Sequence, residues 1–331
     1  MDSRDVHVRA AVRLERHRYH QCGAMTVDVW IPDNTRPEHR SLLPSVSIVH
    51  DLPADGRLPE RLGPGQFLVA GFGVERILDV IPRLDDLQVI QTLSAGVDRL
   101  VDQIPAGVVL CDASGVHDVS VSEWVVMVIL ASLHNLPAHL AGQRDGHWPA
   151  EQVAEADDLE GTMVLILGYG SIGRAVEARL ATFGARFLRV AMHAQKGVSP
   201  ASELPSLLPQ ADIVVVLLPL TDATRGVVDA GFISKMRRGA LLVNAARGPI
   251  VETQALNESL RAGQIRAALD VTDPEPLPDG HPLWSAPGIL ITPHIGGWVR
   301  KRLDRSWRLV AEQVGRFSRG EPLRNVVVEG Y

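Results

Sequence analysis

Three polar residues in the second half of the chain have side chains suited to proton transfer and anion binding. Arg247, Glu275 and His294 each follow an apolar segment typical of a buried strand. Imidazole exchanges protons near neutral pH, so His294 is suited to general acid or base catalysis. A carboxylate such as Glu275 would stabilise the imidazolium and fix its orientation. The planar guanidinium of Arg247 is suited to binding a substrate carboxylate or carbonyl oxygen.

A glycine motif upstream of these residues predicts a bound dinucleotide. Gly168, Gly170 and Gly173 form the pattern G-x-G-x-x-G between an apolar strand and a helix-forming run. The first glycine permits a tight turn, the second leaves room for the pyrophosphate, and the third lets the helix pack close to the strand. The N–H groups and dipole at the helix start attract the anion. Because the strand and helix that the motif requires are both present, we predict a dinucleotide-binding βαβ unit.

Apolar segments around the glycine motif have the pattern of a doubly wound parallel sheet. They cover residues 164–168, 186–191, 212–218, 240–246, 266–271 and 288–293. In the strand order 3-2-1-4-5-6 the last three strands are neighbours, and ligands bind beyond their carboxyl ends. Arg247, Glu275 and His294 would therefore converge at the nicotinamide half of the site.

This placement predicts hydride transfer coupled to proton transfer on a 2-keto acid. Reduction of a ketone needs a hydride at carbon, which nicotinamide supplies, and a proton at oxygen, which His294 would donate. In reverse, neutral His294 would take the hydroxyl proton. Each residue alone also fits a lesser role: His294 as a cofactor contact, Arg247 as a surface helix cap, and Glu275 as a solvated loop residue. The histidines lack metal-ligand spacing, so we predict no metal.

The first part of the chain predicts a second, smaller α/β unit. Its apolar segments are residues 26–31, 46–50, 67–71, 87–93 and 108–112. Near the end of the chain, residues 300–318 have helical spacing of apolar side chains, and the terminal VVVEG (326–330) would return as a strand to this unit.

The segment between the two units predicts a contact with a partner. Residues 119–136 read as one long helix that is apolar on most sides, which is expected to be buried between domains or against a second subunit. Residues 137–158 are polar and loop-like, and a loop of this length could wrap around that subunit.

These elements predict an α/β protein in which a Rossmann-type doubly wound parallel-sheet domain is inserted into a smaller flavodoxin-like α/β substrate domain. We place the NAD(P)-binding domain at residues 113–298 and the substrate-binding domain at residues 25–112 and 299–331. Residues 1–24 are rich in arginine and histidine and poor in apolar side chains. We interpret them as a disordered extension, with a functional tail as the alternative.

Composition excludes several classes of protein. The net charge of −6 argues against a nucleic-acid partner and against attraction to an anionic membrane. The longest apolar run, residues 124–133, is far shorter than the roughly 20 residues that span a bilayer. The two cysteines, Cys22 and Cys111, form no CxxC pair, so a disulfide framework or cysteine metal site is not expected. We expect a cytoplasmic protein.

At these residues the chain resembles the D-isomer-specific 2-hydroxyacid dehydrogenases. The matching segments keep that family's order and spacing over nearly all of residues 26–328. They are LSAGVD (93–98), SEWVVMVILA (122–131), LGYGSIGRAV (167–176), LLPLTDATRG (217–226), LLVNAARGPIV (241–251), AALDVTDPEPLP (267–278) and ITPHIGG (291–297). The resemblance implies an oxidoreductase that interconverts 2-keto and D-2-hydroxy acids, similar to glyoxylate/hydroxypyruvate reductases. It also implies Arg247, Glu275 and His294 as catalytic residues, and a homodimer.

The resemblance also implies binding residues. Backbone amides at Ser94, Ala95, Gly96 and Val97 would bind the substrate carboxylate. Asp270 looks like the family's aspartate of the nicotinamide domain. The predicted cofactor contacts are Gly168, Tyr169, Gly170, Ser171, Ile172, Gly173, His193, Leu218, Pro219, Thr224, Ala245, Ala246, Arg247, Asp270, His294, Gly296 and Gly297.

One position departs from the pattern of an NAD-preferring domain. Such domains usually have Asp or Glu at the end of the second strand, where the carboxylate binds the ribose hydroxyls. Ala191 stands there, so no acid at that position repels a 2′-phosphate, and Arg189, His193 and Lys196 are the candidates to attract one. We therefore predict that NADP(H) is favoured over NAD(H), with relaxed specificity as the alternative.

Other functions fit the same architecture. A co-repressor-like dinucleotide sensor without significant turnover would keep a similar set of polar residues. Formate or phosphite oxidation is a further alternative, although formate enzymes of this kind lack a glutamate at the position of Glu275. Turnover of a keto acid that depends on His294 would separate the dehydrogenase from the sensor.

Overall fold

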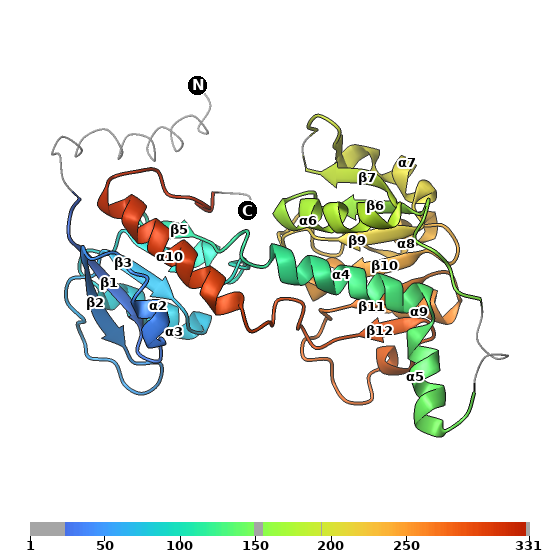
Figure 1. Ribbon diagram of the computed structural model, residues 1–331, viewed down its shortest axis with the longest axis horizontal. Helices are drawn as coiled ribbons and strands as arrows, with labels where there is room; N and C mark the ends of the chain where they lie inside the picture. Colours follow the sequence, from blue (N-terminus) through green and yellow to red (C-terminus); the bar gives the residue numbers. More distant parts are fainter. Residues whose placement is uncertain (1–23, 149–154, 193, 329–331) are drawn as a thin grey trace. The chain divides into compact units, whose positions relative to one another are not determined.

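The computed structural model describes residues 24–148, 155–192 and 194–328, which divide into two compact units (Figure 1). The first unit contains the described residues up to Val116 and those from Leu303 on. The second unit runs from His117 to Arg302. Residues 1–23 of the predicted extension lie outside the described residues.

The first unit is built on a five-stranded parallel sheet with the order β2-β1-β3-β4-β5. This is the order of flavodoxin-like sheets. Its strands are β1 (Val27–Pro32), β2 (Ser47–Leu52), β3 (Phe67–Ala70), β4 (Val89–Thr92) and β5 (Val109–Cys111). Its helices are α2 (Pro37–Arg40), α3 (Val74–Val80), η1 (Ile81–Arg83), η2 (Val101–Gln103) and α10 (Arg302–Ser318). The central strand β3 is buried along its whole length, as expected for a parallel sheet covered on both faces.

The last helix and the tail after it join this unit. On α10, Trp307, Val310 and Val314 pack against Val29 and Phe67 of the sheet in one buried cluster. Of the predicted terminal strand, the described residues 326–328 form no strand and make one antiparallel bridge to β5, between Val326 and Cys111.

The second unit is built on a seven-stranded parallel sheet with the order β12-β11-β10-β9-β6-β7-β8. Its strands are β6 (Met163–Leu167), β7 (Arg186–Ala191), β8 (Ser199–Pro200), β9 (Ile213–Val216), β10 (Leu241–Asn244), β11 (Arg266–Leu269) and β12 (Ile289–Ile291). The predicted strands are confirmed, and β8 is an addition at the edge. With two residues, one of them proline, β8 has no apolar pattern that a sequence reading could detect.

Helices cover both faces of this sheet, as in a doubly wound fold. They are α4 (Asp118–Leu133), α5 (Leu136–Asp145), α6 (Ser171–Leu180), η3 (Ala181–Phe183), η4 (Ala201–Glu203), α7 (Leu204–Leu207), η5 (Leu208–Gln210), α8 (Ala230–Lys235), η6 (Gly248–Ile250), α9 (Thr253–Arg261) and η7 (Pro282–Ser285). One buried cluster joins α4 and α6 to the sheet, and a second joins α8 and α9 to it. The predicted α/β fold class is therefore confirmed, with parallel sheets of five and seven strands.

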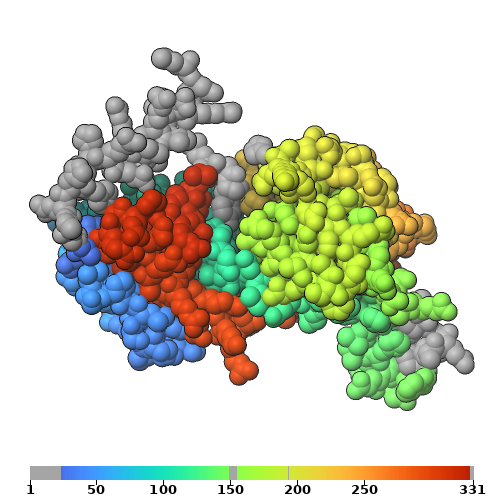
Figure 2. All heavy atoms as spheres, turned by 45° about the horizontal axis from the view of Figure 1, so that its top comes forward, coloured from blue at the N-terminus to red at the C-terminus, as the bar shows by residue number. Residues whose placement is uncertain are grey.

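The predicted long helix and the polar loop after it are wrong in detail. The helix α4 ends at Leu133, Asn135 takes a left-handed backbone with φ of 50°, and α5 then runs to Asp145. Pro137 lies in the first turn of α5, where proline is tolerated because its missing N–H would have had no partner. Figures 1 and 2 show α5 standing out from the second unit, and Gly142 is its one buried residue.

No single helix among the described residues is long and apolar enough to cross a membrane. The helices α4 and α5 meet at a bend of 68°. Taken together, they are long and apolar enough, by length and composition alone.

Candidate active site

His294 lies in a tight turn just beyond the carboxyl end of β12. Its backbone N–H donates to the Asp270 carbonyl at 2.8 Å and to the Thr292 carbonyl at 3.0 Å. Its φ is 55°, a left-handed conformation that residues other than glycine rarely adopt. Such conformations persist where the surrounding structure enforces them, often at functional sites. The turn leaves 48% of the imidazole side chain exposed, so a substrate can reach it.

Glu275 reaches the histidine from the loop that follows β11. Its Oε1 lies 2.6 Å from Nδ1 of His294. An ionised carboxylate only accepts hydrogen bonds, so beside it Nδ1 carries the hydrogen, and Nε2 would be the nitrogen available for proton exchange. The structure thus brings two of the three predicted catalytic residues into direct contact.

Arg247 follows β10, which lies next to β11 in the sheet. A buried asparagine shapes the turn that carries it. Asn244 donates through Nδ2 to the Arg247 carbonyl at 3.0 Å and accepts from the Ala246 N–H at 3.1 Å. The predicted catalytic residues therefore follow three adjacent strands, β10, β11 and β12, as the strand-order argument required.

Gly248 allows the Arg247 turn to pass directly against the loop that leads to Glu275. A Cβ atom at Gly248 would lie 1.8 Å from the carbonyl oxygen of Thr272 and 2.2 Å from its carbonyl carbon. Any side chain there would push apart the segments that carry two of the catalytic candidates. The sequence motifs pointed to no role for Gly248 or Asn244. The position of Asn244, a polar residue at the end of an apolar strand, was the one feature of the sequence that could have indicated its role in the turn.

Asp270 is buried beneath the histidine turn, with 5% of its surface exposed. Its Oδ1 accepts from the Thr292 hydroxyl at 2.6 Å and from the Ile295 N–H at 2.8 Å. Its Oδ2 accepts from the Gly296 N–H at 2.7 Å. The carboxylate therefore holds the residues on both sides of His294. Its predicted contact with a cofactor stays a prediction.

The glycine loop has the geometry that a pyrophosphate requires. Gly168 has φ of 100°, and a Cβ there would lie 2.6 Å from the backbone carbon of Leu217. At Gly173 a Cβ would lie 3.1 Å from the Gly168 carbonyl oxygen, which reflects close packing of α6 on β6. At Gly170, directly before the first residue of α6, a Cβ would meet no atom within 4 Å. Open space at a helix N-terminus fits an anion.

The other predicted cofactor contacts flank this loop. Leu218, Pro219 and Thr224 follow β9, and Ala245 and Ala246 follow β10. Thr224 is buried, and its hydroxyl donates to the Pro219 carbonyl at 2.6 Å, so it shapes the loop after β9. Contact between these residues and a cofactor stays a prediction.

At the adenosine end of the predicted site, β7 ends at Ala191 rather than at an acidic residue. Arg189 is not available to a phosphate in the way the sequence reading suggested. Its guanidinium makes two hydrogen bonds to Glu177 of α6, from Nε at 2.6 Å and from Nη2 at 2.5 Å. These bonds hold the pKa of Glu177 below its ordinary value. Lys196 is exposed, and His193 lies outside the described residues.

The predicted carboxylate-binding loop belongs to the first unit and follows the carboxyl end of β4. The Ser94 carbonyl accepts from the Thr92 hydroxyl at 2.6 Å and from the Ala113 N–H at 3.0 Å. Val97 is buried, with 1% exposed, and anchors the far end of the loop. The loop is thus held at both ends, and substrate binding by Ser94, Ala95, Gly96 and Val97 stays a prediction.

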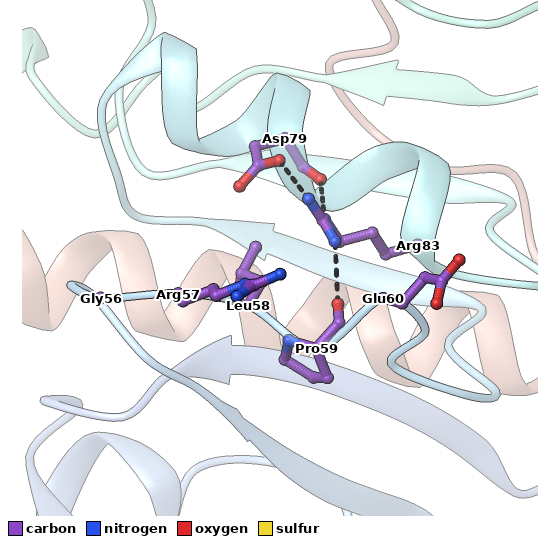
Figure 3. Close-up of a pocket in the computed structure, with 7 residues that line it drawn as sticks. All are labelled: Gly56, Arg57, Leu58, Pro59, Glu60, Asp79 and Arg83. Atoms are coloured by element: carbon purple, nitrogen blue, oxygen red, sulfur yellow. Dashed lines mark hydrogen bonds and ion pairs between the residues drawn. The ribbon is translucent and has the colours of Figure 1, made fainter.

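A hollow of about 700 Å³ in the first unit includes none of the predicted site residues (Figure 3). Two of its charged side chains pair with each other, because Arg83 donates to Asp79 at 2.7 Å, and Arg83 also donates to the Pro59 carbonyl at 2.9 Å. In the part of the chain that the structure describes, no group of three or more His, Cys, Asp or Glu residues could hold a metal ion.

Residues 126–296 match the family model "D-isomer specific 2-hydroxyacid dehydrogenase, NAD binding domain". The chain is 34% identical to the human glyoxylate reductase/hydroxypyruvate reductase over 262 residues, which are 75% of this chain and 79% of that protein. It is 31% identical over 279 residues to the D-3-phosphoglycerate dehydrogenase of Methanocaldococcus jannaschii, covering 82% of this chain and spanning 53% of that protein's length.

A similar solved structure is the NADPH-dependent glyoxylate/hydroxypyruvate reductase of Sinorhizobium meliloti in complex with NADP and sulfate. The two chains superpose with a TM-score of 0.78 at 27% identity, over 91% of this chain and 98% of the other.

Proposed function

Because the chain belongs to the D-isomer-specific 2-hydroxyacid dehydrogenases, we propose that it reduces a small 2-keto acid to a D-2-hydroxy acid with NADPH. Glyoxylate and hydroxypyruvate are the proposed substrates, since relatives in human and S. meliloti are named for them. The observation that carries the proposal is the 2.6 Å hydrogen bond between Glu275 and His294 beyond adjacent parallel strands.

In the proposed reaction His294 donates a proton from Nε2 to the carbonyl oxygen of the keto acid. The nicotinamide, when bound, supplies the hydride that adds to the carbonyl carbon. Glu275 accepts the hydrogen bond from Nδ1, which keeps the ring oriented and stabilises the imidazolium before transfer. Arg247 binds the substrate carboxylate and polarises the carbonyl through its planar donors. The exposed ring of His294 then regains its proton from solvent.

The cofactor would bind with its pyrophosphate over Gly170 and the start of α6. The open space at that glycine and the unpaired N–H groups of a first helical turn suit the anion. The main-chain turn at Gly168 and the tight packing at Gly173 support an anion site at the carboxyl end of β6, beside β9.

A panel of glyoxylate, hydroxypyruvate, pyruvate and phenylpyruvate, each with NADPH and NADH, tests the proposal. We expect the highest kcat/KM for glyoxylate or hydroxypyruvate with NADPH. Binding of the cofactor without turnover of any of these acids would favour a dinucleotide-sensing protein. A tenfold or greater preference for NADH would contradict the proposed cofactor.

Substitution of Ala191 by aspartate tests the cofactor proposal at the position that motivates it. A carboxylate at the end of β7 would repel the 2′-phosphate and bind the ribose hydroxyls instead. We expect kcat/KM with NADPH to fall about 100-fold, since placing like charges together costs several kcal/mol. The matched control is Ala191→Asn, which adds a side chain of the same shape without charge. Equal losses in the two variants would mean that size rather than charge sets the preference.

We also propose that α4 and α5 form a homodimer contact. These helices expose large apolar side chains: Val119 is 40% exposed, Met127 50%, Leu136 45% and Leu140 54%. Exposed apolar surface of this kind marks an interface. The mass from sedimentation equilibrium would then be twice that of the 35.9 kDa chain.

A further inference from the structure

A chain of side-chain hydrogen bonds joins the helix α4 to the turn that carries His294. Nε1 of Trp124 lies 2.9 Å from the Thr292 hydroxyl. That hydroxyl lies 2.6 Å from Oδ1 of Asp270. The Asp270 carboxylate then accepts the N–H groups of Ile295 and Gly296 at 2.8 and 2.7 Å. Every bond of this chain lies within the second unit.

The chemistry of the groups sets the direction of each bond. An indole N–H can only donate, and an ionised carboxylate can only accept. The Thr292 hydroxyl must therefore accept from Trp124 and donate its single hydrogen to Asp270. If Trp124 lost its donor, the hydroxyl would no longer be held in that orientation. Trp124 thus acts on Asp270 through Thr292.

Burial and close packing make this arrangement rigid. Trp124 and Asp270 are each 5% exposed, so water does not readily replace a lost partner. A Cβ atom at Gly296 would lie 2.9 Å from Oδ2 of Asp270 and 3.4 Å from Cγ of Trp124. The turn beside His294 therefore sits directly on both side chains, and a shift in either one moves the turn.

We propose that Trp124 and Thr292 are positioning residues that hold the His294 turn, through Asp270, in the geometry needed for proton transfer. This role rests on the proposed function, because the step that they serve is the transfer of a proton from His294. The left-handed backbone at His294, with φ of 55°, needs such support, since this conformation is unfavourable without it.

Thr292→Val and Trp124→Phe test the proposal. The first removes the hydroxyl while keeping the shape of the side chain, and the second removes the indole N–H together with part of the ring. We expect kcat for keto-acid reduction to fall at least about tenfold in each variant, since displacements of about 1 Å can cost 100-fold. KM for the keto acid should stay within about twofold, because neither residue lies in the loop of residues 94–97 that is expected to bind the substrate carboxylate. Thr292→Ser keeps the hydroxyl and should restore kcat to near the parent value.

Trp30→Phe is the matched control. Trp30 lies in the first unit, is 7% exposed, and donates through Nε1 to the Pro64 carbonyl at 2.8 Å. Trp30→Phe removes this hydrogen bond, so it should lower the melting temperature about as much as Trp124→Phe does and leave kcat unchanged. If the two variants lost the same fraction of kcat, a general loss of stability would explain the result and the proposal would be wrong.

Hydrogen exchange at the amides of Ile295 and Gly296 provides a readout that needs no turnover. Thr292→Val should speed exchange of these two amides at least about tenfold. Without the Thr292 hydroxyl, the Asp270 carboxylate that accepts from them is held less firmly, and the turn opens more often. Thr292→Ser should leave it unchanged. Parent-like exchange and kcat in Thr292→Val would overturn the proposal. A parent protein without turnover would overturn the proposed function instead, and faster exchange in Thr292→Val would still support the holding of the turn.

Discussion

Replacement of His294 by asparagine is expected to lower kcat for keto-acid reduction by about 1,000-fold, within the range that general acid catalysis contributes. Asparagine cannot deliver a proton to the carbonyl oxygen. It tolerates a left-handed backbone better than other non-glycine residues, so the turn with φ of 55° should be kept. Alanine would mix the loss of the imidazole with backbone strain. The measurement is the initial rate of NADPH oxidation with saturating keto acid.

A companion variant separates proton transfer from orientation of the ring. Glu275→Gln keeps an oxygen at the position that accepts from Nδ1 of His294 at 2.6 Å, but it removes the charge. We expect an intermediate loss of kcat, about 100-fold, because the imidazolium loses its counter-charge. Melting temperatures of His294→Asn and Glu275→Gln equal to that of the parent protein would show that both variants fold. If His294→Asn retained more than a tenth of the parent kcat, another group would have to supply the proton.

Replacement of Gly248 by alanine is expected to lower the free energy of unfolding by about 3 kcal/mol, as overpacking with a backbone shift does. The added Cβ would lie 1.8 Å from the Thr272 carbonyl oxygen, and the obstacle is backbone rather than a movable side chain. The segments that carry Arg247 and Glu275 would have to separate. We therefore expect loss of turnover as well as stability, measured by urea denaturation and by kcat/KM.

Gly170→Ala is the matched control for the loss of stability expected in Gly248→Ala. Its added Cβ would meet no atom within 4 Å, and the backbone there is not left-handed. We expect its urea midpoint to equal that of the parent protein, although its affinity for NADPH should fall. A parent-like midpoint in Gly248→Ala would contradict the packing seen between the two loops.

Much of the architecture follows from local sequence. The mainly apolar segments that become β6, β9 and β10 are buried along nearly their whole length, as near-continuous apolar runs are in the strands of a covered parallel sheet. Local rules failed at β8, which has two residues, and at α5, whose polar residues were interpreted as a loop. Short edge strands and helix starts carry too few residues for periodicity to be measured.

In the candidate site, too, some features were predictable from the sequence and others were not. Its location was predictable, because strand order places the ends of β10, β11 and β12 side by side. The role of Asp270 was not, since its partners Thr292 and Gly296 lie more than twenty residues along the chain. Trp124 and Thr292 are separated by 168 positions, and no local pattern connects them.

The sequence by itself determined the residue types of the site, the glycine loop, the fold class and the neighbouring strand ends. These depend on chemistry and on periodicities that act over a few residues. Only the tertiary structure decided that Glu275 hydrogen-bonds to Nδ1 of His294, that Arg189 is paired with Glu177, and that Gly248 admits no side chain. Contacts of this kind depend on ångström-scale packing between segments distant in sequence, where a shift of one methyl group changes which atoms meet.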